Sequence, residues 1–183
     1  VEKEIAFVRS RKEFAATLVD MQEQGKLPLR VTHNDTKLNN VLFDEATGLP
    51  LAVVDLDTVM PGLSINDFGD SIRFGATYAA EDEPDLRKVN FDLELFEYYT
   101  RGFLGECGSL MTENEKKMLP VGAIMMTFEC GMRFLTDYLN GDTYFKIHRK
   151  HHNLDRCRTQ FKLVSDMEEN REQMDRIVEK YCC

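Results

Sequence analysis

The feature that most constrains this chain is a short polar loop flanked by apolar residues. The stretch VTHNDTKLNN, Val31–Asn40, carries His33, Asp35 and Asn40 on one segment. It is unusual for a simple connecting loop to carry a His, an Asp two residues later and an Asn five residues after that Asp. Such a set needs partners elsewhere in the chain, so we expect the fold to bring a second polar segment to this loop.

The spacing of these three residues matches the catalytic loop H-R-D-x-x-x-x-N of protein kinases. In that loop the Asp accepts the proton of the attacking hydroxyl group and the Asn holds Mg²⁺. The pattern therefore predicts Asp35 as the catalytic base of phosphoryl transfer and Asn40 as a metal ligand. We expect His33 to be structural, with its ring tied to the loop backbone near Asp55.

A second polar segment follows the turn DEATGLP. The apolar run LAVVDL, 51–56, is predicted to be a strand that returns to the loop and delivers Asp55 to it. Mg²⁺ takes oxygen ligands, and few of them from protein, so a carboxylate at this position suits the metal. Asp57 is either a second metal ligand or a solvated turn residue, and Lys37 either touches the transferred phosphate or is a surface lysine.

Asp67-Phe68-Gly69 spells the D-F-G of protein kinases, but it begins a helical run and does not follow a strand. In kinases the Asp of that motif binds Mg²⁺. Here Asp55, which lies across one hairpin from Asn40, occupies the corresponding place. We therefore expect Asp67 to support the catalytic loop from the start of a helix and not to bind the metal.

The overall composition is that of an acidic, folded protein. The chain has 183 residues, of which 43% are hydrophobic and 30% charged, with a net charge of −9. A negative surface argues against nucleic acid as a partner, and the longest apolar run is too short for a membrane span. The five Cys form no C-x-x-C pair, which indicates a reducing, cytoplasmic environment.

Hydrophobic periodicity predicts an α+β fold that is mostly helical, with one small β ribbon carrying the polar loop. The expected strands are Leu29–Thr32, Asn40–Phe43 and Leu51–Leu56. The expected helices are Glu4–Gln24, Ile65–Phe74, Phe91–Leu104, Thr112–Leu119, Val121–Leu139 and Leu154–Tyr181. Thr112, with Glu115 three residues later, predicts a capping box.

Longer blocks of sequence make the pattern more specific. HNDTKLNNVLFD and AVVDLDTVMPGLSINDFGDSIRFG resemble the aminoglycoside phosphotransferase family, a branch of the protein-kinase-like fold. Within that family the resemblance is closest to bacterial N-acetylhexosamine 1-kinases, and it continues through ECGMRFLTDYL, GDTYF and HNLDRCRTQF. It implies a kinase that uses ATP and Mg²⁺ to phosphorylate the anomeric hydroxyl group of N-acetylglucosamine or N-acetylgalactosamine.

The resemblance also implies a sugar pocket beside Asp35. Sugars stack an apolar face on an aromatic ring while polar groups bind their hydroxyls. Phe74, Arg133 and Tyr144 lie in blocks shared with the hexosamine kinases and are the predicted substrate-binding residues. Plainer explanations stay open, with Phe74 as ordinary core and Arg133 as an ion-pair residue.

Complete members of the resembled family carry an N-terminal nucleotide lobe with a phosphate-covering loop and a Lys that grips the ATP phosphates. This sequence has no G-x-G-x-x-G and no strand of the V-A-I-K type. We therefore expect residues 1–183 to form the C-terminal lobe, with the catalytic loop and the substrate site. The nucleotide lobe is expected to belong to the full-length protein, and this chain alone to be inactive.

Two other functions stay open. One is a different small-molecule kinase of the same family, with an aminoglycoside, an amino alcohol or another sugar as acceptor. The other is a non-catalytic pseudokinase or sugar-binding module, which the intact Asp35, Asn40 and Asp55 argue against. Sulfatase chemistry is excluded, because no Cys or Ser is followed two residues later by Pro.

Overall fold

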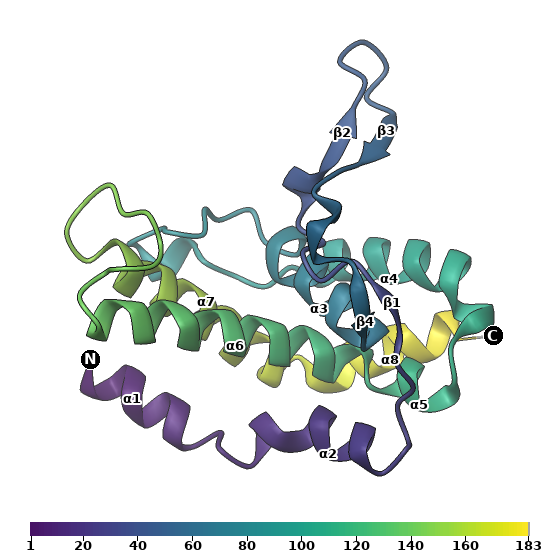
Figure 1. Ribbon diagram of the computed structural model, residues 1–183, viewed down its shortest axis with the longest axis horizontal. Coiled ribbons are helices and arrows are strands. Elements are labelled where there is room, and N and C mark those ends of the chain that lie inside the picture. Colours follow the sequence, from purple (N-terminus) through teal and green to yellow (C-terminus); the bar gives the residue numbers. More distant parts are fainter. Residues whose placement is uncertain (183) are drawn as a thin grey trace.

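The computed structural model describes residues 1–182, which form a helical body with two short β ribbons (Figure 1). The α-helices are α1 (Glu2–Arg9), α2 (Thr17–Glu23), α3 (Ser64–Gly75), α4 (Leu93–Cys107), α5 (Glu113–Lys117), α6 (Leu119–Leu139), α7 (His152–Glu169) and α8 (Arg171–Tyr181). The strands are β1 (Arg30–Thr32), β2 (Val41–Phe43), β3 (Pro50–Val53) and β4 (Met60–Gly62). Single turns of 3₁₀ helix lie at Phe14–Ala16, Leu38–Asn40, Leu56–Thr58, Leu86–Lys88 and Gly108–Leu110. The expected α+β, mostly helical class is confirmed.

Helix α6 packs against both α3 and α7 and organises the helical body (Figure 1). Two glycines let α3 and α6 approach closely. A Cβ on Gly69 would lie 2.3 Å from the carbonyl oxygen of Gly122, and a Cβ on Gly122 would lie 2.2 Å from a methyl carbon of Ile65. No larger side chain fits such a contact. The backbone of α6 therefore sets the position of α3, the helix that carries Asp67.

Aromatic side chains fill the core between these helices. Phe68, Phe96 and Phe128 are completely buried, and the rings of Phe68 and Phe96 meet edge-on with centroids 5.9 Å apart. The predicted capping box at the start of α5 is confirmed. Thr112 Oγ1 accepts a hydrogen bond from the backbone N–H of Glu115, and the Glu115 carboxylate accepts one from the N–H of Thr112.

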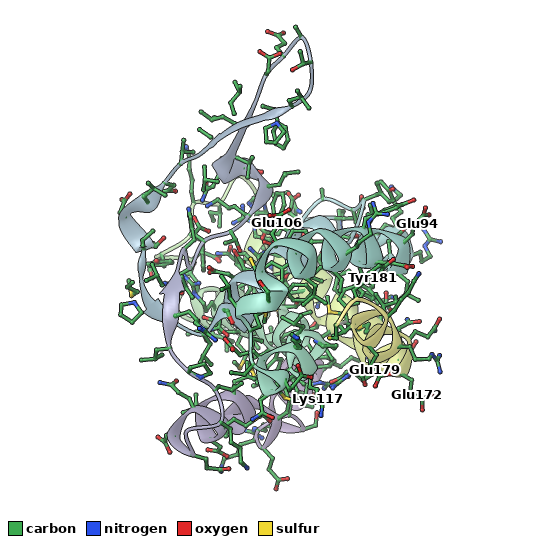
Figure 2. The ribbon with its side chains drawn as sticks, turned by 90° about the vertical axis from the view of Figure 1, so that its right-hand side faces the viewer. Glu94, Glu106, Lys117, Glu172, Glu179 and Tyr181 are labelled. Carbon is green, nitrogen blue, oxygen red and sulfur yellow. The ribbon has the colours of Figure 1, made fainter. Side chains whose placement is uncertain are left out.

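The outer faces of α4 and α8 carry exposed charged side chains. Figure 2 shows Glu94 and Glu106 on α4 and Glu172 and Glu179 on α8, and all four side chains are exposed. Among the described residues, no helix has the length and apolar character needed to cross a membrane.

The β structure consists of two antiparallel ribbons, so the single ribbon expected from the sequence is wrong. β1 pairs with β4, with Arg30 opposite Gly62 and Thr32 opposite Met60, while β2 pairs with β3. The sequence of β4, Met-Pro-Gly, does not predict a strand, because Pro lacks an N–H group and both Pro and Gly are poor strand formers. The β1–β4 pairing brings the two ends of segment 30–62 together at the helical body.

The β2–β3 hairpin projects away from the helices (Figures 1 and 2). Strand β3 ends at Val53, three residues before the end that the sequence predicted. Asp55 therefore does not lie on the strand; it follows it in the left-handed conformation, with φ 62°, which Asp tolerates better than most residues. The apolar side chains of the hairpin face solvent, with Leu42 49% and Leu51 66% exposed.

Two helices that the sequence predicted as continuous are each broken. The expected helix 4–24 divides into α1 and α2, because Ser10 Oγ donates to the carbonyl oxygen of Phe7 at 2.8 Å and competes with the helical hydrogen bonds. The expected helix 154–181 divides into α7 and α8 at Asn170. Its side-chain Nδ2 donates to a carbonyl oxygen in the last turn of α7, at 2.8 Å, and ends that helix.

Candidate active site

The first turn of α3 holds the loop between β1 and β2. The Asp67 carboxylate accepts hydrogen bonds from the backbone N–H groups of His33 and Asn34, both at 2.8 Å. Thr36 Oγ1 donates to the backbone carbonyl oxygen of Asp67 at 2.6 Å, and Ser71 Oγ donates to that of Thr36 at 3.1 Å. The carboxylate of Asp67 is thus used to hold the loop backbone from a helix start.

The same loop is also tied to the segment that carries Asp55. His33 Nε2 lies 3.0 Å from the carbonyl oxygen of Val54. Thr58 Oγ1 donates to the carbonyl oxygen of His33 at 2.6 Å, and Asn34 Nδ2 donates to that of Thr58 at 3.0 Å. These bonds fix the loop against the residues on either side of Asp55.

The sequence pattern does not point to Asn34 or Thr58 as parts of the site. Asn34 adopts φ 64°, a conformation in which Asn is enriched, so an Asn within this polar loop was the available signal. Thr58 carried no such signal. Its contact with the loop depends on the pairing of β1 with β4, which brings residues 24 and 25 positions apart together.

Asp35 lies at the centre of the loop. Its Oδ2 accepts hydrogen bonds from Lys37 Nζ at 2.7 Å and from Asn40 Nδ2 at 2.9 Å. Partial burial by itself would raise the pKa of Asp35, but the hydrogen bonds from Lys37 and Asn40 outweigh that effect and hold the pKa below its usual value. Asp35 is therefore ionised at neutral pH and has a carboxylate that can receive a proton.

Asn40 is buried, and its amide group is oriented by Asp35. Nδ2 donates both to the backbone carbonyl oxygen and to Oδ2 of Asp35, at 2.8 and 2.9 Å. Its Oδ1 has no hydrogen-bond partner within residues 1–182. An amide oxygen turned away from the carboxylate in this way is a suitable ligand for a hard cation.

Asp55 and Asp57 are both exposed, and Asp57 lies in the 3₁₀ turn that follows Asp55. Neither carboxylate has a hydrogen-bond or ion-pair partner in the part of the chain that the structure describes. Within residues 1–182, no group of three or more His, Cys, Asp or Glu side chains could hold a metal by itself. Mg²⁺ usually takes one or two carboxylates together with substrate phosphates and water, so the donor set of Asn40, Asp55 and Asp57 fits this ion chemically.

The three predicted sugar-binding residues have different neighbours. Arg133 and Tyr144 both contact Phe145, with the guanidinium 5.5 Å from its ring centroid and the Tyr144 ring centroid at 4.8 Å. Both side chains are well exposed, at 50% and 74%. Phe74 instead lines a cavity at the end of α3. Within residues 1–182, no hydrogen bond, ion pair or ring contact joins Arg133 or Tyr144 to the loop of Asp35.

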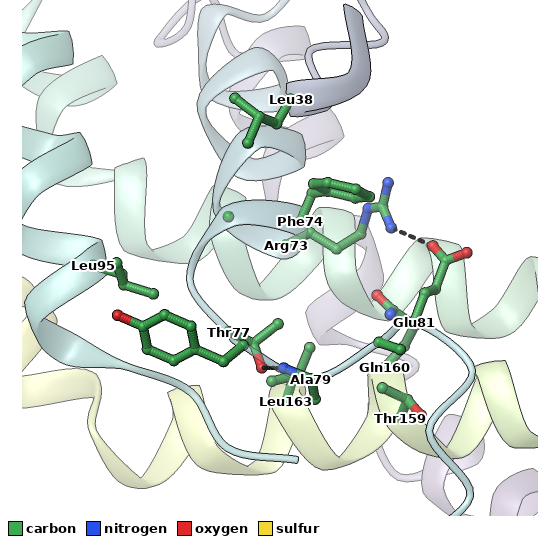
Figure 3. A pocket seen from close by; sticks show the side chains of 13 residues that line it. Leu38, Arg73, Phe74, Thr77, Ala79, Glu81, Leu95, Thr159, Gln160 and Leu163 are labelled. Carbon is green, nitrogen blue, oxygen red and sulfur yellow. Dashed lines mark hydrogen bonds and ion pairs between the residues drawn. The ribbon is translucent and has the colours of Figure 1, made fainter. Parts of the chain in front are cut away.

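Leu38, in the loop of Asp35, lies in the walls of two cavities. The cavity lined by Phe74 has a volume of about 340 Å³ and lies between the end of α3, residues 76–81, α4 and α7 (Figure 3). Leu38, directly after Lys37, lines it from the loop side. The second cavity, about 460 Å³, lies beside His33 and also touches Leu38. Both volumes fall within the range of small-molecule sites, roughly 300–1,000 Å³.

A comparison with known families places the chain. Residues 3–103 match the model of the phosphotransferase enzyme family known as APH. The match spans more than half of the 183 residues and includes the whole loop that carries His33, Asp35 and Asn40, together with Asp55 and Asp67. The chain therefore belongs to the phosphotransferase enzyme family, which implies a kinase-like fold. Arg133 and Tyr144 lie outside the matched residues.

Proposed function

We propose that the protein is an ATP- and Mg²⁺-dependent kinase that phosphorylates the anomeric hydroxyl group of N-acetylhexosamines. The observation that carries the proposal is the hydrogen-bonded set of Asp35, Lys37 and Asn40, tied to the segment that carries the unpaired carboxylate of Asp55. Membership of the phosphotransferase enzyme family supports phosphoryl transfer to a small molecule. The choice of an N-acetylhexosamine as acceptor rests on the resemblance of the longer sequence blocks.

In this proposal the acceptor hydroxyl group lies at Asp35. As its oxygen bonds to the γ-phosphorus of ATP, the bond from that phosphorus to the bridging oxygen breaks, ADP leaves, and Asp35 takes the hydroxyl proton. Lys37 keeps Asp35 ionised and contacts the transferred phosphate. Asn40 and Asp55 hold Mg²⁺, and Asp57 either adds a ligand or stays in solvent. When bound, the metal neutralises charge on the phosphates.

The low pKa of Asp35 bears on the timing of proton transfer. Hydrogen bonds from Lys37 and Asn40 make its carboxylate a weak base. A weak base takes the proton late, once bond formation to phosphorus has made the hydroxyl acidic. This order agrees with a loose, metaphosphate-like transition state, in which positioning and charge stabilisation account for most of the catalysis.

We also propose that these residues are the C-terminal lobe of a two-lobed kinase whose nucleotide lobe covers the β2–β3 hairpin. The support is the exposed apolar surface of this hairpin, where Leu42 is 49%, Leu51 66% and Val53 55% exposed. Contiguous apolar surface on a soluble protein usually marks an interaction site. The chain by itself is then expected to fold, to bind ATP weakly and to turn over none, since half of the phosphate contacts belong to the other lobe.

The substrate is tested with the full-length protein, ATP, Mg²⁺ and either N-acetylglucosamine or N-acetylgalactosamine, with the product analysed by NMR. We expect the phosphate on the anomeric carbon. A 6-phosphate product would refute the reaction proposed here, as would rapid turnover of an aminoglycoside or amino alcohol without turnover of either sugar. Sugar binding without transfer to any acceptor would identify a pseudokinase.

The residue roles are tested with two variants of the full-length protein. Asp35→Asn should lower kcat by roughly 10²–10⁴-fold with little change in the KM for the sugar. Asp55→Asn, which keeps a side chain suited to the left-handed backbone, should raise the Mg²⁺ concentration needed for activity and be partly restored by excess Mg²⁺. Asp20→Asn, at an exposed position on α2, is the control. Equal losses of tenfold or less for the two site variants would mean that the roles are wrongly assigned.

A further inference from the structure

The loop between α6 and α7, residues 140–151, projects from one end of the helical body (Figure 1), and each half of it is held by a buried side chain. Asp137 holds the first half, since its carboxylate accepts hydrogen bonds from the backbone N–H groups of residues 143–145 at 2.8–2.9 Å. Burial alone would raise the pKa of Asp137, but these bonds outweigh burial and lower it. His152, the first residue of α7 and 3% exposed, holds the second half.

The contacts of His152 define the protonation state of its ring. Nδ1 lies 3.1 Å from the backbone nitrogen of His148, whose N–H group can only donate, so Nδ1 carries no proton and accepts this bond. The proton of the neutral ring is then on Nε2, which lies 3.0 Å from Asp82 Oδ2 and donates to it. His152 thus joins the loop to the segment between α3 and α4, and it makes both bonds only as the neutral ring.

Protonation of His152 would break one of these bonds and keep the other. The second proton can be added only at Nδ1, where it would point at the N–H group of His148, so that two donors would face each other. The bond from Nε2 to Asp82 would become charge-assisted and stronger. The ring would therefore stay with residue 82 while residue 148 is released.

Negative charges around the ring favour its protonated form. Asp82 is in direct contact with Nε2. Asp155, on the same helix, forms an ion pair with Arg149 of the loop. On α6, Asp137 accepts a hydrogen bond from Asn153, the residue after His152. Asp82 is thus the carboxylate that an imidazolium ring would use.

Positive charges oppose that form. Arg149 Nη2 lies 3.6 Å from Asp82 Oδ2 and donates to the Asp82 carbonyl oxygen at 2.8 Å, so it competes for the same residue. The ring centroid of His148 is 5.6 Å from that of His152, and Arg156 follows on the same helix. The N-terminus of α7 also disfavours a positive charge on its first residue. Attraction and repulsion thus meet at one buried ring, whose charge decides whether residue 148 is bound.

We propose that His152 is a pH-dependent latch on the second half of this loop. The neutral ring binds residue 148 and keeps residues 146–150 on the helical body, and the protonated ring releases them while Asp137 still holds residues 143–145. Histidine is the residue type whose charge changes between about pH 5 and 8, so a latch of this kind responds to modest changes in pH. Tyr144 then keeps support from one side only.

The protonation state is tested first, by the NMR shifts of the His152 ring nitrogens at about pH 7.5. We expect a protonated Nε2 and an unprotonated Nδ1. A neutral ring with its proton on Nδ1 would overturn the proposal, because the N–H group of His148 would then have no acceptor there. A ring that does not change its charge between about pH 7.5 and 5.5 would overturn it as well.

Release of the loop is tested by hydrogen exchange over the same pH range. The protection factor of the His148 amide, which corrects for the intrinsic pH dependence of exchange, should fall about tenfold or more as the ring is protonated. The amides of residues 143–145 and of α6 should keep their protection. An unchanged protection factor for His148 would overturn the proposal, and so would an equal loss at all of these amides, which would indicate general unfolding in acid.

His152→Asn is the matched variant. Its Oδ1 can replace Nδ1 as the acceptor and does not titrate, so the His148 amide should stay protected as the pH falls. His151→Asn is the control, because position 151 is exposed and has φ 62°, which Asn tolerates. This control should keep the pH response of the parent protein. The same response in both variants would refute the latch.

The consequence for the acceptor rests on the proposed function and is measured in the full-length protein. The KM for N-acetylglucosamine should rise about two- to tenfold over the same fall in pH in the parent protein and less in His152→Asn, because a smaller fraction of the parent has an ordered loop. Equal pH dependence of KM in both proteins would refute this consequence. If no sugar is phosphorylated, the proposed function fails, and the exchange of the His148 amide still decides the latch.

Discussion

Two regions of this molecule keep their shape by different interactions. In the helical body the core is apolar, and side chains such as Phe68, Phe128 and Met167 are completely buried. Of residues 30–62, all of which the structure describes, only Thr32 and Asn40 are buried, and both are polar. The segment that carries the catalytic loop therefore has almost no core of its own.

Segment 30–62 is ordered mainly by hydrogen bonds to the helical body and within itself. Asp67, Thr58 and Ser71 between them form hydrogen bonds to the backbone at positions 33, 34 and 36 of the loop. Hydrogen bonds depend on direction, while apolar burial does not. The comparison teaches that the helices provide stability, and that directional bonds from α3 give Asp35 and Asn40 their geometry.

The largest expected difference between the regions is in stability. Phe128→Ala removes a completely buried ring from the core and should lower the free energy of unfolding by about 3–5 kcal/mol. Phe43→Ala, on the hairpin at 48% exposure, should lower it by less than about 1 kcal/mol. Chemical denaturation of both variants measures the two effects. Similar losses would show that the hairpin shares the core and would break the comparison.

Two of the hydrogen bonds that join segment 30–62 to the helical body end at the Asp67 carboxylate, and a substitution there weakens them. Asp67→Asn presents an amide to the two N–H groups of His33 and Asn34, so at least one of them loses its acceptor. We expect the loop to be destabilised by about 2–4 kcal/mol, because hydrogen bonds to a charged acceptor are the stronger ones. Hydrogen exchange of these two amides should quicken while amides in α6 stay protected. Unchanged exchange at both amides would contradict the assigned role.

A second connection between the regions is sensitive to pH. The Glu115 carboxylate accepts hydrogen bonds from Arg30 Nε and Nη2, at 3.0 and 2.8 Å, and from Ser64 Oγ at 2.8 Å. Burial alone would raise the pKa of Glu115, but hydrogen bonds from Arg30, Thr112 and Ser64 lower it to about 2. The folded state thus favours ionised Glu115. Since one unit of pKa corresponds to about 1.4 kcal/mol, this lowering contributes about 3 kcal/mol to the free energy of unfolding.

This contribution is complete above the ordinary pKa of 4.5 and is lost as the pH falls toward about 2. Glu115→Gln should therefore be about 2–3 kcal/mol less stable than the parent protein at pH 7, and the difference should shrink between pH 4.5 and 2. Unfolding measured across this range checks the sign. Glu113→Gln, exposed on the same helix, is the control and should show no such dependence. A difference that grows on acidification would refute the assignment.

The smallest expected effect lies inside the loop. Lys37→Met removes the 2.7 Å hydrogen bond to Asp35, which lowers the pKa of that carboxylate. Because partial burial acts in the opposite direction, the pKa of Asp35 should rise in the variant. In the parent protein, ionised Asp35 stabilises the fold at every pH above the ordinary pKa of an Asp side chain, and this stabilisation is lost on acidification. In the variant it should be lost at a higher pH than in the parent protein. NMR titration of the Asp35 carboxyl carbon measures the change, with Lys26→Met as the control. A lowered pKa would contradict the role of Lys37, whereas stability at pH 7 should change by less than about 1 kcal/mol.

The sequence by itself determined the features that depend on neighbouring residues. The spacing of His33, Asp35 and Asn40, the capping box at Thr112, and helices α3 to α6 to within a few residues were all predictable, because periodicity, capping and loop spacing are local. Asp67 was also predictable as a residue at a helix start, and its hydrogen bonds to the loop follow from the position of that helix.

The tertiary structure alone decided which distant segments meet. The β1–β4 pairing and the contact of Thr58 with His33 depend on how helices and ribbons pack, and no nearby residue encodes them. The same holds for Gln160, which in the sequence is one polar residue on a helix. Only the close packing of α7 against α6 removes its amide from water.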